Sequence, residues 1–227
     1  MTQDGNQPAS GAPDHGRTLE FGFFLDPAAK APAAVVDTAG LLDRLGYDLI
    51  GIQDHPYQAA HLDTQSLLGV ILAQTSRVIP IWIGANKPRA LALTGRIGDG
   101  WVSPLMMYKP PAEAAEANRA IDRAAIEAGR QPRDIRRIYN IQGSFTRQPT
   151  RAFDTDGDIT GPPEQWSDVL THFALDVGFD TFILGGDSDE RTITTFITDV
   201  APAVRQRVAD ARALSPRDAL TEQRQLT

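Results

Sequence analysis

The stretch Leu49-Ile50-Gly51-Ile52-Gln53-Asp54-His55-Pro56-Tyr57 decides how the rest of the sequence is interpreted. It is a short apolar run that ends abruptly in polar and ionisable side chains, after a helix-like segment that closes at Gly46. Such a run predicts a buried strand with Asp54 and His55 at its carboxyl end. In α/β folds, catalytic and binding groups gather at that end of the strands. We therefore expect His55 to be functional; the alternative is a structural histidine bonded to a neighbouring carbonyl group.

Strand-like and helix-like segments alternate on both sides of this stretch. The predicted strands cover residues 21–26, 48–53, 79–84, 99–104, 135–145 and 180–184. The predicted helices cover residues 32–45, 63–76, 91–97, 111–128, 164–177 and 193–208. Six strands that alternate with six helices predict an α/β fold with a parallel sheet built from βα units.

The length of 227 residues suits one α/β domain with a substantial core. Residues 1–17 carry almost nothing apolar, which predicts a disordered leader. We expect a single domain over residues 18–214 and a polar tail over residues 215–227.

The composition argues against several classes of partner. The formal net charge is −7, and no run of Lys or Arg offers a surface for nucleic acid or anionic lipid. The absence of cysteine excludes disulfides, thiolate nucleophiles and Cys-based zinc sites, and it fits an intracellular protein. No apolar run approaches the ~20 residues of a membrane span. We expect a cytoplasmic protein that binds neither nucleic acid nor membrane.

Two turns have the composition of anion-binding sites. The turn Gly84-Ala85-Asn86-Lys87 precedes a helix, whose free N–H groups and positive dipole end attract phosphate. The alternative is that Asn86 only caps this helix and Pro88 fills its first turn. Gly185-Gly186 follows the last strand and allows an anion to approach the backbone closely, although it also suits a tight strand-to-helix turn.

These residues resemble the bacterial luciferase-like monooxygenase family, the flavin-dependent (β/α)8 barrels that also include oxidoreductases using the deazaflavin coenzyme. The resemblance covers roughly residues 19–211. Its specific part runs from Ile81-Trp82-Ile83-Gly84-Ala85 to Leu93-Thr94-Gly95-Arg96-Ile97-Gly98-Asp99-Gly100-Trp101. The strands 21–26 and 49–57 and the Ala-rich helix before Gly129 add weaker support.

The resemblance implies a cofactor and assigns roles to the candidate residues. The cofactor is FMN, or alternatively the deazaflavin coenzyme. His55 occupies the position of the family's active-site histidine at the end of the second strand, where it acts as acid/base with Asp54 orienting it. The turn Gly84-Ala85-Asn86-Lys87 corresponds to the family's phosphate-binding turn. Phe24 and Trp101 are expected to line the pocket of the flavin ring. The residues expected to bind cofactor are Gly84, Ala85, Asn86, Lys87, Phe24, Trp101, Gly185 and Gly186.

The sequence departs from the family near Arg77. There the family has a third and a fourth strand with their helices, and this chain has only a short join between the helix ending at Ser76 and the strand at Ile79. About six βα units therefore predict an incomplete TIM-barrel-like sheet. It can be a smaller distorted barrel, an open sheet, or a homodimer in which each partner lends strands to the other.

Three functions remain open from the sequence. The first is a flavin-dependent oxidoreductase or monooxygenase that acts on a small organic substrate, with reduced flavin supplied by a reductase. The second is a non-catalytic flavin-binding or interaction protein left by the loss of two strands. The third, a metal-dependent hydrolase, is weakest: its ligands would be Asp54, His55, His61 and Asp63 on one loop, and no other strand end supplies a histidine. We predict no metal.

Overall fold

The structure is a computed structural model. It describes residues 13–52, 58–73, 82–104, 108–150, 158–185 and 189–225, with only the backbone at 64, 65, 72 and 215–225.

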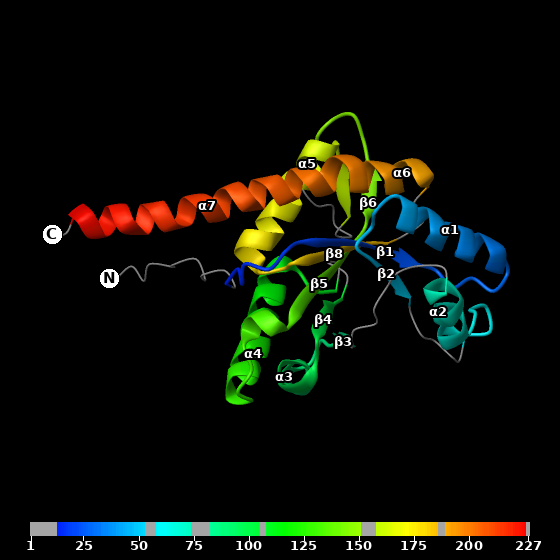
Figure 1. Cartoon of the computed structure of the whole chain (residues 1–227), viewed down its shortest axis with the longest axis horizontal. Coiled ribbons are helices and arrows are strands. Elements are labelled where there is room, and N and C mark those ends of the chain that lie inside the picture. The colour runs from blue at the N-terminus through cyan, green and yellow to red at the C-terminus, as the bar shows by residue number, and fades with distance from the viewer. Residues whose placement is uncertain are drawn as a thin grey trace, which may run out of the picture.

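A six-stranded sheet forms the centre of the molecule, and all its neighbouring strands are parallel (Figure 1). The sheet is curled like part of a barrel, so the prediction of an incomplete TIM-barrel-like α/β fold is confirmed. In their order across the sheet, the strands are β2 (Leu49–Ile52), β1 (Glu20–Leu25), β8 (Thr181–Leu184), β5 (Arg136–Ile141), β4 (Gly100–Ser103) and β3 (Trp82–Gly84).

Helices surround the outer face of the curled sheet (Figure 1). In α1, Val35, Ala39 and Leu42 are the buried residues, as their helical spacing predicts. The α-helices are α1 (Pro32–Arg44), α2 (Thr64–Leu72), α3 (Pro88–Ile97), α4 (Pro111–Glu127), α5 (Pro163–His172), α6 (Glu190–Thr195) and α7 (Ala201–Gln225). A 3-10 turn η1 (Pro132–Asp134) and two π-helical turns, η2 (Phe173–Val177) and η3 (Phe196–Val200), complete the helical elements of the described residues. No helix in this part of the chain is long and apolar enough to cross a membrane.

The predicted strand 135–145 is two strands in the structure. β5 ends at Ile141, and β6 (Gly143–Phe145) pairs with β7 (Ile159–Gly161) in a separate two-stranded parallel sheet. Gly143 has φ 152°, and a Cβ there would lie 1.9 Å from the Ile159 carbonyl oxygen. Only glycine fits where the backbone at 143 passes so close to Ile159. At this residue the pairing of β5 with β8 has ended, and the pairing of β6 with β7 begins.

The two faces of the main sheet differ in what covers them. The large core on the outer face joins strand residues such as Phe21, Trp101 and Tyr139 to the helices. A small cluster on the inner face consists of strand residues alone: Leu49, Ile138, Ile183, Phe24, Trp82 and Val102. In the described part of the chain, no helix packs on this inner face.

β2 and β3 are the edge strands of the described sheet. They lie on either side, in sequence, of the segment in which two strands of a complete barrel are missing. Among the described strands, β2 and β3 do not pair with each other, which agrees with the prediction of an incomplete barrel.

Candidate functional site

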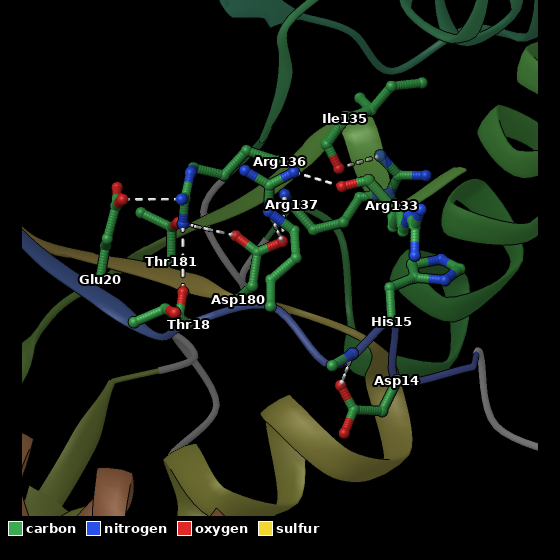
Figure 2. A network of polar contacts seen from close by, with 12 residues as sticks. Asp14, His15, Thr18, Glu20, Arg133, Ile135, Arg136, Arg137, Asp180 and Thr181 are labelled. Atoms are coloured by element: carbon green, nitrogen blue, oxygen red, sulfur yellow. Dashed lines mark hydrogen bonds and ion pairs between the residues drawn. The ribbon is translucent and has the colours of Figure 1, made fainter. Parts of the chain in front are cut away.

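At the amino end of the inner face, charged side chains form ion pairs and hydrogen bonds with one another (Figure 2). Arg136 lies 2.6 Å from Glu20 and 3.2 Å from Asp180, and it donates a 3.0 Å hydrogen bond to the Thr181 hydroxyl. Burial raises the pKa of the Asp180 carboxyl above its ordinary value, although the charge of Arg136 partly opposes this effect. A second carboxylate, that of Glu20, also has its pKa raised by burial.

The same network continues on the outer side of the sheet and reaches residues 13–17 (Figure 2). Arg137 is fully buried and pairs with Asp122 of α4, which also accepts a 3.2 Å hydrogen bond from His15. Burial alone would raise the pKa of Asp122, but the hydrogen bond from His15 and the charge of Arg137 hold it below its ordinary value. Each of these charged side chains has an ionic partner within the protein, although the Nε atoms of Arg17 and Arg137 are buried without a hydrogen-bond partner among the described residues.

The middle of the inner face is filled by side chains. A Cβ added to Gly22 would lie 2.2 Å from the Leu49 side chain. A Cβ added to Gly100 would lie 2.7 Å from both Trp82 and Ile138. These glycines are places where a neighbouring side chain already fills the space.

The glycines at the carboxyl end of the inner face are less tightly packed than those in its middle. The nearest atom to a Cβ added at Gly51 is 3.6 Å away, and at Gly185 it is 3.7 Å away. At Gly84, nothing lies within 4 Å. Phe24 stands between the first two, because β1 lies between β2 and β8. Gly51 and Gly185 thus flank Phe24 at one side of the sheet, whereas Gly84 lies on the edge strand β3, which β5 and β4 separate from β8.

The amino end of α3 follows Gly84, because β3 leads into it. The helix begins at Pro88, and its N-cap residue is Lys87, with no side-chain cap hydrogen bond. The alternative that Asn86 caps the helix is therefore wrong. The side chains of Asn86, Lys87 and Arg89 are exposed, so the helix terminus and its two cations are available to an anion.

Trp101 does not lie on the inner face, although we expected it to line the pocket of the ring. It is 0% exposed, it lies on the outer face, and it stacks on Phe179 with ring centroids 5.9 Å apart. Its indole N–H donates a 2.8 Å hydrogen bond to the Ala85 carbonyl. Since Ala85 is itself buried, Trp101 holds the turn between β3 and α3 from the outer side of the sheet.

Three of the predicted site residues fall outside the described part of the chain. They are Asp54, His55 and Gly186. Of the described residues, Phe24 and Gly185 lie together on the inner face, and Gly84 lies on the same face at the edge strand β3, followed in sequence by Lys87.

Near the carboxyl end, the sequence analysis missed Asn140 and considered His61 only as a metal ligand. Asn140, the fifth residue of β5, shares the inner face with Ile138 and has a buried amide oxygen with no hydrogen-bond partner among the described residues. His61 bridges to Ala28 and lies 3.8 Å from Asp26, which follows β1. The sequence did contain a signal for Asn140, because it is a polar residue near the end of a largely apolar strand. No group of three or more His, Asp or Glu side chains in the described part is placed to hold a metal ion.

Comparison with known proteins identifies the middle of the chain. Residues 78–155 match the family model for luciferase-like monooxygenase, so the resemblance is confirmed over the segment that begins at the join. The chain is 42% identical over 55 residues to a phthiodiolone/phenolphthiodiolone dimycocerosates ketoreductase of Mycobacterium kansasii, and 40% identical to that of Mycobacterium tuberculosis. Each match covers 24% of this chain and 14% of the relative, so the chain aligns with only a small part of these proteins.

Solved structures share the fold over most of the chain. An F420-dependent secondary alcohol dehydrogenase matches with a TM-score of 0.66 and 12% identity, over 83% of this chain and 99% of that one. The coenzyme F420-dependent tetrahydromethanopterin reductase of Methanopyrus kandleri matches with a TM-score of 0.69 and 13% identity, over 82% and 99%. A long-chain alkane monooxygenase matches with a TM-score of 0.67 and 9% identity, over 85% and 92%. At these identities the likeness shows the fold alone.

Proposed function

We propose, from the match of residues 78–155 to the luciferase-like monooxygenase model, that this protein is an oxidoreductase of that class that binds a flavin or deazaflavin. The observation that carries the proposal is that glycines stand at the carboxyl ends of three strands on the inner face, Gly51, Gly185 and Gly84, where a Cβ would meet no steric clash. A tricyclic ring is flat and largely apolar, and it fits a surface that has backbone where side chains would stand. The structural neighbours that use F420 support the same class of ligand.

The residues around this surface suit the two ends of such a cofactor. The ring would lie over the glycines beside Phe24. Its phosphate would meet the uncapped first turn of α3, where Lys87 adds a positive charge. Gly186 follows Gly185 in the sequence and remains a predicted cofactor-binding residue. FMN is our first choice of cofactor, and the deazaflavin coenzyme is the alternative.

A bound flavin or deazaflavin supplies the electron pair that a small organic substrate or dioxygen accepts. From the sequence, we assign proton transfer to His55, with Asp54 holding the imidazole in one orientation. A His55→Ala variant that still binds cofactor should lose ~100-fold or more in turnover. Unchanged turnover in that variant would remove His55 from the mechanism.

A non-catalytic flavin-binding protein is the second candidate, and the incomplete barrel favours it. The described strands end at β2 and β3, where a closed barrel would continue. A site that lacks these walls excludes water less well than a closed one. Cofactor binding without consumption of reduced flavin beyond the rate in buffer would favour this candidate over the enzyme.

Titration with FMN and with the deazaflavin coenzyme, followed by fluorescence, tests the proposal. Gly84→Leu should weaken binding about tenfold or more, because its side chain would fill the space that Gly84 leaves. Gly69→Leu is the matched control, since a Cβ at exposed Gly69 of α2 also has nothing within 4 Å. A folded wild-type protein that binds neither cofactor would contradict the proposal.

We also propose the partners and location that the sequence suggested. A homodimer would protect the two open sheet edges, which otherwise expose unpaired backbone groups. A separate reductase would supply reduced flavin, and the cytoplasm is the expected location. Sedimentation of the purified protein should give twice the monomer mass, whereas a monomeric species would exclude the dimer.

A further inference from the structure

Asn140 occupies a position on the inner face that its neighbours define. It pairs with Ile183 across β5 and β8, and Ile138 precedes it on the same face. Ile141 follows it and ends the strand. Asn140 is thus the inner-face residue nearest the carboxyl end of β5, on the strand adjacent to the one that carries Gly185.

The Asn140 amide is incompletely bonded. Its Oδ1 atom is buried and has no hydrogen-bond partner among the described residues. Its Nδ2 atom donates one long hydrogen bond, 3.5 Å, to the Ser103 carbonyl. By contrast, Gln142 two residues later donates a 2.6 Å hydrogen bond to Asp158. A buried amide oxygen without a partner costs free energy, so it is a position where a bound donor is favoured.

The neighbours of Asn140 determine what kind of donor fits. The inner-face side chains around it, Ile183 and Val102, are apolar, and the adjacent β8 is followed by Gly185, where no side chain stands. An anion would be poorly solvated there and has cations at Lys87 instead. A neutral ring that presents an N–H beside a carbonyl oxygen matches the acceptor and donor of a primary amide.

We propose that Asn140 reads the pyrimidinedione edge of the bound ring, accepting a hydrogen bond from its N3–H through Oδ1 and donating through Nδ2 to an adjacent ring carbonyl. The inference rests on the proposed function, because it needs a flavin or deazaflavin on the inner face. The edge is common to both cofactor types, so the role of Asn140 is the same for either. Asn140 is a binding and positioning residue, since it takes no part in electron or proton transfer.

Binding of FMN and of N3-methyl-FMN to wild-type protein and to Asn140→Leu tests the inference by fluorescence. The methyl group removes the N3–H donor. Wild-type protein should bind FMN about tenfold more tightly than N3-methyl-FMN. In Asn140→Leu, FMN binding should weaken about tenfold and the preference should fall to about one. The thermal midpoint should stay the same or rise, since leucine removes the unbonded amide.

Asn118→Leu is the matched control. Asn118 is a buried amide on α4, away from the inner face; its Nδ2 donates to the Val177 carbonyl at 2.8 Å, and its Oδ1, like that of Asn140, has no hydrogen-bond partner among the described residues. This variant should lose stability but keep the wild-type preference for FMN.

The outcomes separate the inference from the function on which it rests. Equal binding of FMN and N3-methyl-FMN by the wild type, or an unchanged preference in Asn140→Leu, would overturn the role of Asn140 while flavin binding stands. Failure of the wild type to bind FMN at all would overturn the proposed function, and the role of Asn140 with it.

Discussion

The two ends of the inner face of the sheet differ in how many of their polar side chains find hydrogen-bond or ion-pair partners within the protein. At the amino end, Arg136 bridges Glu20, Asp180 and the Thr181 hydroxyl, so buried charges find partners in the chain. At the carboxyl end, a Cβ added to the glycines would meet no clash, and the Asn140 oxygen has no partner among the described residues. A protein saturates its interactions where it needs stability and leaves them unsaturated where a ligand completes them. The contrast supports the proposal that the carboxyl end of the inner face binds the ligand.

The largest expected effect is at the amino end. Arg136→Met should lower the free energy of unfolding by ~3–5 kcal/mol, because it leaves the Glu20 and Asp180 carboxylates buried without their main partner. Urea unfolding at pH 7 measures this loss. Arg119→Met on α4 removes an exposed ion pair with Glu116 and should cost less than ~1 kcal/mol. Equal losses in the two variants would mean that the amino-end network is not structural.

A pair of alanine substitutions compares the tightly packed and the less tightly packed glycines of the inner face. Gly22→Ala places its Cβ 2.2 Å from the Leu49 side chain and should destabilise the protein by ~1–3 kcal/mol. Gly51→Ala meets nothing closer than 3.6 Å and should change stability by less than ~0.5 kcal/mol. Chemical unfolding of both variants gives the difference. A similar cost at both positions would show that the carboxyl end is packed as tightly as the middle.

The dependence of unfolding free energy on pH tests the part of the charged network around Asp122. The pKa of Asp122 is lower in the folded protein than its ordinary value, so its contribution to stability is present above ~3.9 and is lost as pH falls through the folded pKa. Asp122→Asn should therefore flatten the acid limb of stability against pH. Asp168→Asn, at an exposed position on α5, is the control for the loss of one surface carboxylate. An unaltered acid limb in Asp122→Asn would contradict the assignment.

The smallest effect is expected at the start of α3. Lys87→Ala should weaken FMN binding by only ~2–5-fold, because an exposed charge at a helix terminus contributes ~0.3–1 kcal/mol. The loss should shrink as salt is added. Arg96→Ala, in the last turn of the same helix, should have no effect. A loss of the same size in both variants would point to net charge rather than to a phosphate site.

Several elements were predictable because their signals are local. The stripe Val35, Ala39 and Leu42 has helical spacing and is buried in α1. Asp63 was predicted to begin a helix, and its carboxylate accepts a 2.8 Å hydrogen bond from the Ser66 N–H. The strand β7 was missed, because three residues in a polar stretch carry too little pattern to distinguish them from a loop.

The candidate site was harder to predict than the elements that carry it. Phe24 and Trp101 were both expected beside the ring, yet they lie on opposite faces of the sheet. The run Phe21-Gly22-Phe23-Phe24-Leu25 is apolar throughout, as in strands buried on both faces. No alternation of polar and apolar residues marks the inner face. The register between strands assigns the faces instead.

By itself, the sequence determined the βα alternation and the class of fold, because apolar periodicity and turn residues act over short distances. Only the tertiary structure decided which glycines have a side chain packed against them, which charges pair at the amino end, and that Asn140 lies on the inner face. Each of these depends on contacts between residues far apart in the chain, such as Arg136 with Glu20 or Gly22 with Leu49. Local pattern carries no information on such contacts until the sheet has formed.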